Sequence, residues 1–201
     1  MKISSFGITQ IALGMGSALL LTATNLHAQE NPGPSGYYVN GDVGVSFGDN
    51  VTANIGFGND ETSLKTGVRT DLSAGYNFAL GRNFYLAPEL ELGYLYPSDD
   101  NGSGNSGGFS QVPVLVNGVL EWKFAPKWSV YGGLGVGGEY MYVSNSDGDG
   151  GSGGVAWQGK LGVKYQLGPG ELGLGYEYLG AAAPFLTIAN HTIFASYTLH
   201  F

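Results

Sequence analysis

Residues 192–201 read TIFASYTLHF. Apolar side chains occupy every second position, namely Ile193, Ala195, Tyr197, Leu199 and Phe201, and the positions between them are mostly polar. Successive side chains of a β-strand point to opposite faces of the sheet. This alternation therefore predicts a strand with one apolar and one polar face.

Seven further stretches show the same alternation, and most are longer than the roughly 5–6 residues usual for strands of soluble proteins. A strand that crosses a lipid bilayer at a tilt needs about 9–11 residues, which these lengths allow. The stretches are residues 37–47, 68–78, 84–96, 112–124, 128–142, 155–167 and 172–178.

Charged residues are confined to one face of these eight stretches. No apolar-face position is Asp, Glu, Lys or Arg, whereas the polar faces carry many of them. An Arg or Lys facing lipid costs about 2–4 kcal/mol at the bilayer midplane, which explains the exclusion. A soluble sandwich also alternates, but its apolar face is the inner one. The pattern predicts an all-β fold, a closed eight-stranded antiparallel up-and-down transmembrane β-barrel.

The connections between the stretches alternate in length. Short links are predicted at 79–83, 125–127 and 168–170, and long ones at 48–66, 97–110, 143–153 and 180–189. Outer-membrane barrels have short turns on the periplasmic side and longer loops outside the cell. We therefore expect four exposed loops on one side of the membrane.

Aromatic residues gather at both ends of the predicted strands, where girdles at the two membrane interfaces are expected. The girdle on the long-loop side contains Tyr94, Tyr96, Tyr140, Tyr142, Tyr176 and Tyr178. The girdle on the short-turn side contains Phe78, Phe84, Trp122, Phe124, Trp128, Tyr165 and Phe201.

The first 28 residues have the pattern of an export signal. Lys2 precedes an apolar stretch at 8–21, and Ala28 offers a small residue for cleavage. A membrane-spanning helix is the alternative, but Thr9 and Gln10 interrupt the apolar run. We expect cleavage after Ala28, which leaves residues 29–201 as the barrel domain of an exported protein.

Composition excludes several other classes of protein. The chain has no cysteine, which rules out disulfide scaffolds, thiolate zinc sites and lipoprotein anchors. Its formal charge of −8 argues against a nucleic-acid partner. No cofactor is expected.

The chain resembles the small eight-stranded outer-membrane barrels of the porin family, which include the OmpA-type membrane domain and the OmpX-like and opacity-type proteins. Its most specific element is the series Ile193, Ala195, Tyr197, Leu199 and Phe201, which is similar to the C-terminal signal read by the barrel-insertion machinery. The glycine-rich stretch YGGLGVG at 131–137 is also typical of such barrels. The resemblance implies a Gram-negative-type outer membrane, with its lipid and lipopolysaccharide and the insertion machinery as partners.

The interior of an eight-stranded barrel is only wide enough for side chains to fill it. We expect a network of salt bridges and water there, with Arg69, Lys160 and Lys164 each close to a carboxylate. A path for protons or small ions is the alternative. Lys123 is placed nearer the periplasmic mouth. The residues assigned to this lumen are Asp42, Arg69, Asp71, Glu89, Glu91, Glu121, Glu139, Lys160, Lys164 and Glu177.

Two prolines fit their predicted strands poorly. Pro88 and Pro113 each remove a donor from a hydrogen-bonded ladder. A bulge or a local loss of pairing is expected at Pro88. For Pro113, its closeness to the second long loop is the milder explanation.

Few residues suit catalysis or metal binding. Lipid A deacylase barrels use an outward His followed two residues later by Ser, but here His191 is followed by Ile193. We therefore expect no enzymatic activity. The stretch NSDGDG at 145–150 resembles the first half of an EF-hand loop, but Ala156 replaces the Glu required at the twelfth position. A flexible loop without a metal is expected.

These observations predict a monomeric outer-membrane protein with a structural or surface-interaction role carried by its four extracellular loops. A narrow pore or small-solute conduit that favours cations is the alternative. A lipid-modifying enzyme is a third possibility, weakened by the missing serine.

Overall fold

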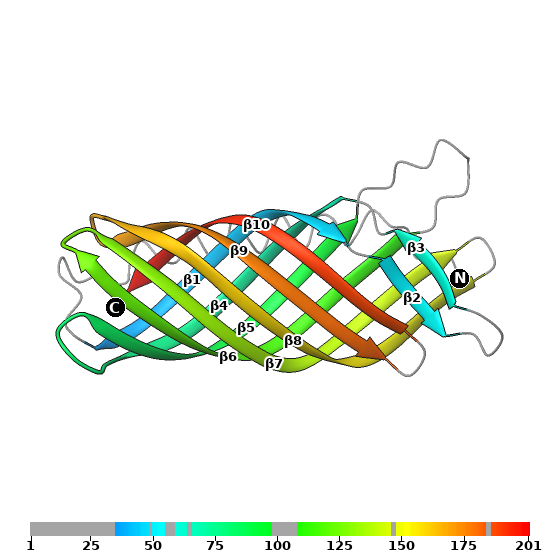
Figure 1. Cartoon of the computed structure of the whole chain (residues 1–201), viewed down its shortest axis with the longest axis horizontal. Coiled ribbons are helices and arrows are strands. Elements are labelled where there is room, and N and C mark those ends of the chain that lie inside the picture. The colour runs from blue at the N-terminus through cyan, green and yellow to red at the C-terminus, as the bar shows by residue number, and fades with distance from the viewer. Residues whose placement is uncertain are drawn as a thin grey trace.

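A computed structural model describes residues 35–48, 50–54, 59–63, 66–97, 108–145, 148–183 and 186–201. The regular structure of this part of the chain consists of β-strands (Figure 1). They are β1 (Gly36–Gly48), β2 (Asn50–Asn54), β3 (Asn59–Ser63), β4 (Gly67–Ala79), β5 (Phe84–Pro97), β6 (Gly108–Ala125), β7 (Trp128–Asn145), β8 (Gly148–Leu167), β9 (Gly170–Ala183) and β10 (Leu186–His200). The predicted export signal at 1–28 lies outside the described residues.

Eight of these strands form a closed barrel. β1 and β4 to β10 pair antiparallel with their neighbours in chain order, and pairing of β1 with β10 closes the ring (Figure 1). Following paired residues once around the wall from Tyr38 leads back to Gly48, ten positions further along β1. This stagger tilts the strands against the barrel axis, typically by about 35–45°. The predicted eight-stranded antiparallel up-and-down barrel is confirmed.

The connections at the two ends of the barrel differ less than the sequence predicts. At one end, called the turn end here, residues 80–83, 126–127 and 168–169 join the strands. Gly168 has a φ of 60°, a backbone conformation that glycine adopts at no steric cost. The opposite end is called the loop end.

Much of the sequence predicted as loop at the loop end is paired strand. β7 and β8 stay in register up to Asn145 and Gly148, and β9 and β10 up to Ala183 and Leu186. The long loops predicted at 143–153 and 180–189 are therefore wrong. These stretches are rich in Gly and Ala, so they show no alternation of apolar and polar residues, yet backbone ladders need no side chains.

The first predicted long loop, at 48–66, contains the hairpin β2–β3. β2 pairs with β10 through Ala53 to Leu186 and Thr52 to Thr187, so the hairpin continues the wall at the loop end (Figure 1). β1 ends at Gly48. Beyond that point the hairpin pairs with β10 in place of β1.

The two prolines interrupt ladders without shifting them. Pairing of β4 with β5 stops after Gly75–Glu89 and resumes at Phe78–Leu86 in the same register. Pro88, which lacks an N–H, lies in this gap. The predicted loss of pairing at Pro88 is therefore confirmed, and the alternative of a bulge is wrong. Pro113 lies in a similar gap between β5 and β6.

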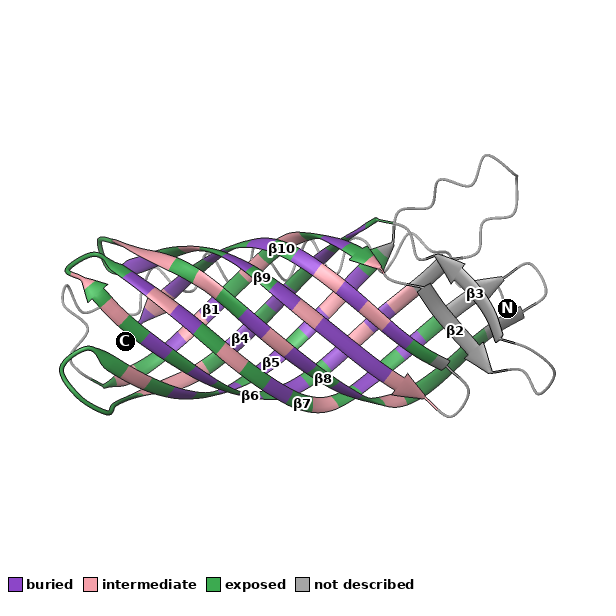
Figure 2. Ribbon diagram, viewed as in Figure 1, coloured by how far each residue is buried: buried purple, intermediate pink, exposed green. Residues whose placement is uncertain are grey.

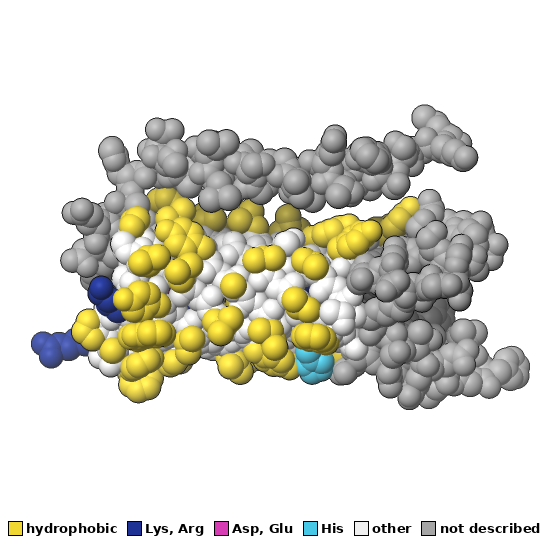
Figure 3. Space-filling view, turned by 90° about the horizontal axis from the view of Figure 1, so that it is seen from above, with side chains coloured by type: hydrophobic (Ala, Val, Ile, Leu, Met, Phe, Trp, Pro, Cys, Tyr) yellow, Lys and Arg dark blue, Asp and Glu magenta, His cyan; other side chains and the backbone are white. Residues whose placement is uncertain are grey.

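Side chains alternate between the lumen and the outer surface along the barrel strands (Figure 2). Val136 and Leu161 on the outside are 66% and 60% exposed, whereas Arg69 on the inside is 0% exposed. Hydrophobic side chains cover much of the outer face seen in Figure 3, with basic side chains at the turn end. No helix in the described part of the chain is long and apolar enough to cross a membrane.

Aromatic residues on the outer face lie toward both ends of the barrel. At the turn end, Trp128 packs edge-on against Tyr165 with 4.9 Å between ring centroids, and Trp122 stacks on Phe84. The predicted girdle residues are exposed or half-buried on this face: Tyr94, Tyr96, Trp122, Phe124, Trp128, Tyr140, Tyr142, Tyr165, Tyr176 and Tyr178.

A charge on the outer face tests whether this surface meets lipid. Leu161→Arg should lower the free energy of unfolding by about 2–4 kcal/mol, because the charge would sit in hydrocarbon. Urea unfolding in lipid vesicles measures the loss. The matched control is Leu80→Arg, in the 80–83 turn, with an expected loss of about 0–1 kcal/mol. Equal losses at the two positions would contradict a lipid-facing belt.

Candidate functional site: the filled lumen

The inner face of the barrel carries four groups of side chains, which follow one another from the turn end to the loop end. They are the mouth cluster (Glu121, Lys123, Lys164, Glu171 and His200), the tyrosine cluster (Tyr38, Ala87, Val119, Tyr131 and Phe194), the central network (Asn40, Asp42, Arg69, Asp71, Glu89, Glu91, Asn117, Gln158, Lys160 and Glu177) and the apolar cluster (Leu115, Met141, Ala156, Leu179, Ala181 and Ile188).

The mouth cluster centres on Glu171. Its carboxylate lies 3.6 Å from the Nζ atoms of Lys123 and Lys164 and 3.2 Å from His200 Nε2. Lys164 Nζ also lies 3.4 Å from Glu121. Lys123 is the most exposed of these cations, with 30% of its side chain accessible, in agreement with its expected place near the mouth.

Glu171 is a lumen residue that the sequence interpretation missed. It is the second residue of β9 and only 2% exposed. The predicted strand began one residue later, at Leu172. Continuing the inward positions Gly173, Gly175 and Glu177 back by one step would have placed Glu171 inside.

The tyrosine cluster separates the mouth cluster from the central network. Tyr38, Ala87, Val119, Tyr131 and Phe194 pack together, and Lys164 Nζ lies 5.9 and 5.1 Å from the ring centroids of the two tyrosines. A cavity of about 20 Å³ beside this cluster has room for one or two water molecules.

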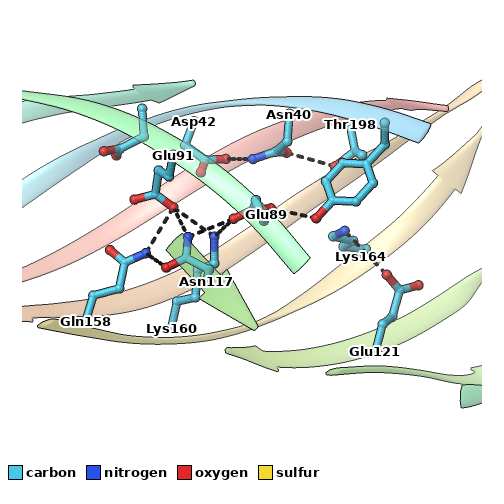
Figure 4. Close-up of polar contacts among 12 residues, drawn as sticks. Asn40, Asp42, Glu89, Glu91, Asn117, Glu121, Gln158, Lys160, Lys164 and Thr198 are labelled. Carbon is cyan, nitrogen blue, oxygen red and sulfur yellow. Dashed lines mark hydrogen bonds and ion pairs between the residues drawn. The ribbon is translucent and has the colours of Figure 1, made fainter. Parts of the chain in front are cut away.

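The central network joins β5, β6 and β8 across the lumen (Figure 4). Lys160 Nζ forms ion pairs with Glu89 and, at 2.9 Å, with Glu91. Asn117 Nδ2 donates to Glu89 at 3.0 Å and to Glu91 at 2.9 Å. Gln158 Nε2 donates to Glu91 at 3.0 Å. The carboxylates of Glu89 and Glu91 are therefore each held by the charged Lys160 and by neutral amide donors.

Arg69 occupies the loop-end side of this network. Its Nε donates to both carboxylate oxygens of Asp71 at 2.9 Å. Its two terminal nitrogens form ion pairs with Glu91 at 3.4 Å and Glu177 at 2.5 Å. One fully buried guanidinium thus contacts three carboxylates, in keeping with the bidentate geometry that arginine favours.

Asp42 and Glu139 are the least neutralised of the expected lumen acids. Asp42 accepts a hydrogen bond from Asn40 at 2.7 Å, and Asn40 accepts one from Thr198 at 2.8 Å. Glu139 is 3% exposed, and neither carboxylate oxygen has a hydrogen-bond partner among the described residues.

Glycines make room for the network. A Cβ atom at position 135 would lie 1.8 Å from Asn117 Oδ1, and one at position 93 would lie 2.3 Å from Asp71 Oδ1. Both distances are shorter than any van der Waals contact, so a side chain at Gly135 or Gly93 would displace a network residue.

The apolar cluster was not predicted. Leu115, Met141, Leu179 and Ile188 are each 1% exposed and fill the lumen toward the loop end. They occupy inward positions of β6, β7, β9 and β10, so their parity could have revealed them. The sequence interpretation followed only the charged residues of these faces and therefore expected a wholly polar interior.

Acidic side chains outnumber basic ones in the described lumen. Eight carboxylates accompany four basic side chains, with His200 in addition. The acids are Asp42, Asp71, Glu89, Glu91, Glu121, Glu139, Glu171 and Glu177, and the bases are Arg69, Lys123, Lys160 and Lys164. The described residues contain no group of three metal-ligating side chains. The calcium-like motif at 145–150 includes 146–147, which lie outside the described residues.

Comparison with known proteins agrees with this architecture. Residues 16–201 match the outer membrane protein beta-barrel domain. The chain belongs to this family of outer-membrane barrels. No curated protein sequence matched it.

Solved structures of other outer-membrane barrels share the fold. Neisserial surface protein A (NspA) is 16% identical, with a TM-score of 0.59 over 83% of this chain and 99% of that one. Ail, the attachment invasion locus protein of Yersinia pestis, in complex with a heparin analogue, is 15% identical, with a TM-score of 0.51 over 82% and 99%. The outer membrane enzyme PagL is 14% identical, with a TM-score of 0.50 over 82% and 99%.

The predicted insertion signal lies along the last strand of this outer-membrane barrel. Ile193, Ala195 and Tyr197 are exposed on its outer face, and Leu199 and Phe201 are half-buried. The Phe201 N–H donates to the Tyr37 carbonyl at 2.9 Å. This bond ties the residue after β10 to the beginning of β1, where the barrel closes.

Removing Arg69 tests the central network. Arg69→Met should lower the free energy of unfolding by about 3–5 kcal/mol, because it leaves buried carboxylates without their cation. Adding Glu177→Gln should recover part of the loss. Urea unfolding measures both, with Lys123→Met as a control whose partly exposed ion pair is worth about 0–1 kcal/mol. A loss for Arg69→Met no larger than the control's would show that Arg69 does not neutralise this cluster.

Proposed function

We propose that this outer-membrane barrel is a closed scaffold that presents β-hairpins at the cell surface for interaction with other molecules. The observation that carries the proposal is the filling of the lumen by successive groups of interlocked side chains. A barrel whose described lumen is filled in this way has its accessible surface at its ends.

The strands support this proposal because they exceed what a membrane crossing requires. A tilted transmembrane strand needs about 9–11 residues, whereas β7 and β8 have 18 and 20. Their excess lies at the loop end, where β2 and β3 extend the wall further. A paired hairpin holds its shape better than an irregular loop of the same length, and so suits a binding surface.

We place the loop end outside the cell and the turn end in the periplasm. The strand extensions and the β2–β3 hairpin lie at the loop end, and outer-membrane barrels usually carry their longer segments outside the cell and short turns in the periplasm. In this proposal residues 1–28 direct export, the barrel is monomeric, and its partners are outer-membrane lipid, lipopolysaccharide and an external ligand.

A narrow conduit for cations is the alternative function. The excess of carboxylates in the lumen favours it, since a channel lined by acids attracts cations. Passage would require the apolar cluster and the central network to separate. The closed scaffold therefore agrees better with the geometry.

We propose no catalytic role for His191. Ile193 stands where a deacylase-like arrangement needs serine, and the Tyr176 hydroxyl contacts the imidazole. A tyrosine phenol is a weak nucleophile without a strong activating base.

Conductance separates the scaffold from the conduit. The purified barrel in a planar lipid bilayer should give no steady current steps, because side chains fill the lumen. An open porin measured in the same bilayer is the control. Discrete cation-selective steps would contradict the closed scaffold and favour the conduit.

Antibody access tests which end is outside. A short peptide epitope inserted between Asn145 and Gly148 should be stained on intact cells, because the tip of the β7–β8 hairpin would project from the surface. The same epitope inserted after Gly168, at the turn end, should be stained only after the outer membrane is permeabilised. The reverse result would invert the proposed orientation.

A further inference from the structure

One side chain departs from the rule that governs the outer face. Where the structure describes their burial, the outward positions of the barrel strands carry no Asp, Glu, Lys or Arg, yet His191 lies among them on β10. Figure 3 shows a histidine beside hydrophobic side chains near the loop end of the outer face. A polar ring in an apolar belt needs a partner or a polar environment.

The depth of His191 identifies that environment. His191 stands ten positions before Phe201, and one membrane crossing takes about 9–11 residues. Because Phe201 lies at the turn end, His191 lies at the opposite interface, at the level of lipid headgroups.

Aromatic contacts hold the imidazole in place. The Tyr176 hydroxyl forms a hydrogen bond with His191 Nδ1, and the Tyr178 ring lies 5.2 Å from the imidazole at 62°. Trp157 lies on the neighbouring strand β8, and its indole covers Gly180, two residues along β9 from Tyr178; a Cβ at Gly180 would come within 2.5 Å of the ring. We call Trp157, Tyr176, Tyr178 and His191 the His191 patch.

The patch combines two kinds of recognition. When the phenol donates to Nδ1, the ring proton of the neutral imidazole resides on Nε2, which makes Nε2 a hydrogen-bond donor. Such a donor suits phosphate oxygens, which are charged acceptors of strong hydrogen bonds. The faces of Trp157 and Tyr178 offer flat apolar surfaces beside polar edges, which suit the C–H face of a sugar ring.

We propose that the His191 patch binds the phosphorylated sugar headgroup of a glycolipid in the outer leaflet, namely lipopolysaccharide. The phosphate accepts a hydrogen bond from His191, whose ring Tyr176 orients, and the adjoining sugar packs on the aromatic rings. A phospholipid supplies the phosphate without the sugar and therefore uses only half of the patch. This inference rests on the proposed outward orientation of the loop end.

The test titrates the folded barrel in detergent with purified lipopolysaccharide and counts bound molecules by native mass spectrometry. His191→Leu should weaken binding about tenfold or more, the worth of a hydrogen bond to a charged group. Tyr176→Phe should weaken it about three- to tenfold. Tyr140→Phe, which alters an exposed tyrosine on β7 outside the patch, is the matched control and should leave binding unchanged.

Two further ligands separate phosphate from sugar. Dephosphorylated lipopolysaccharide should bind wild type and His191→Leu equally, and phosphatidylglycerol should bind more weakly than lipopolysaccharide. The proposal fails if His191→Leu binds like wild type, if Tyr140→Phe loses as much as Tyr176→Phe, or if phosphatidylglycerol binds as well as lipopolysaccharide. A change in electrophoretic mobility on heating verifies that each variant is folded. The epitope experiment checks the orientation separately, so a failure of the patch is distinguishable from a failure of the scaffold proposal.

Discussion

The structure depends on one constraint, which is that backbone N–H and C=O groups inside hydrocarbon have no water to bond with. A β-sheet meets this requirement only by closing on itself, and here β1 pairs with β10 from Tyr38–His200 to Gly48–Asn190. Closure with eight strands fixes the diameter. The small lumen that results must be filled by the side chains that point into it, so the requirement on the wall also determines the character of the interior.

The interior meets this second requirement with charges as well as apolar groups. Arg69 and Lys160 are buried beside carboxylates, which lowers the cost of removing each charge from water. Toward the loop end the same inward positions hold leucine, methionine and isoleucine. Polar and apolar groups thus alternate along the lumen, while the outer face stays apolar between its girdles.

The faces of the strands could be read from the sequence because side-chain direction has a period of two and lipid excludes charges. The positions of Arg69, Glu91 and Lys160 inside the barrel follow from this parity alone. The contacts among them do not, because they depend on the stagger of eight strands. The ends of β7 to β10 were missed because stretches of Gly and Ala show no alternation of apolar and polar side chains. The β2–β3 hairpin was missed because its pairing with β10 depends on residues far away in the sequence.

The central network stabilises the part of the wall where two backbone ladders are interrupted. Pro88 and Pro113 remove backbone pairs on the two sides of β5, so both ladders that hold this strand in the wall are interrupted. β5 also carries Glu89 and Glu91. Both form ion pairs with Lys160, which lies on β8 across the lumen. The ion pairs therefore connect β5 to β8 across the lumen. They stabilise from within the strand whose backbone ladders are interrupted.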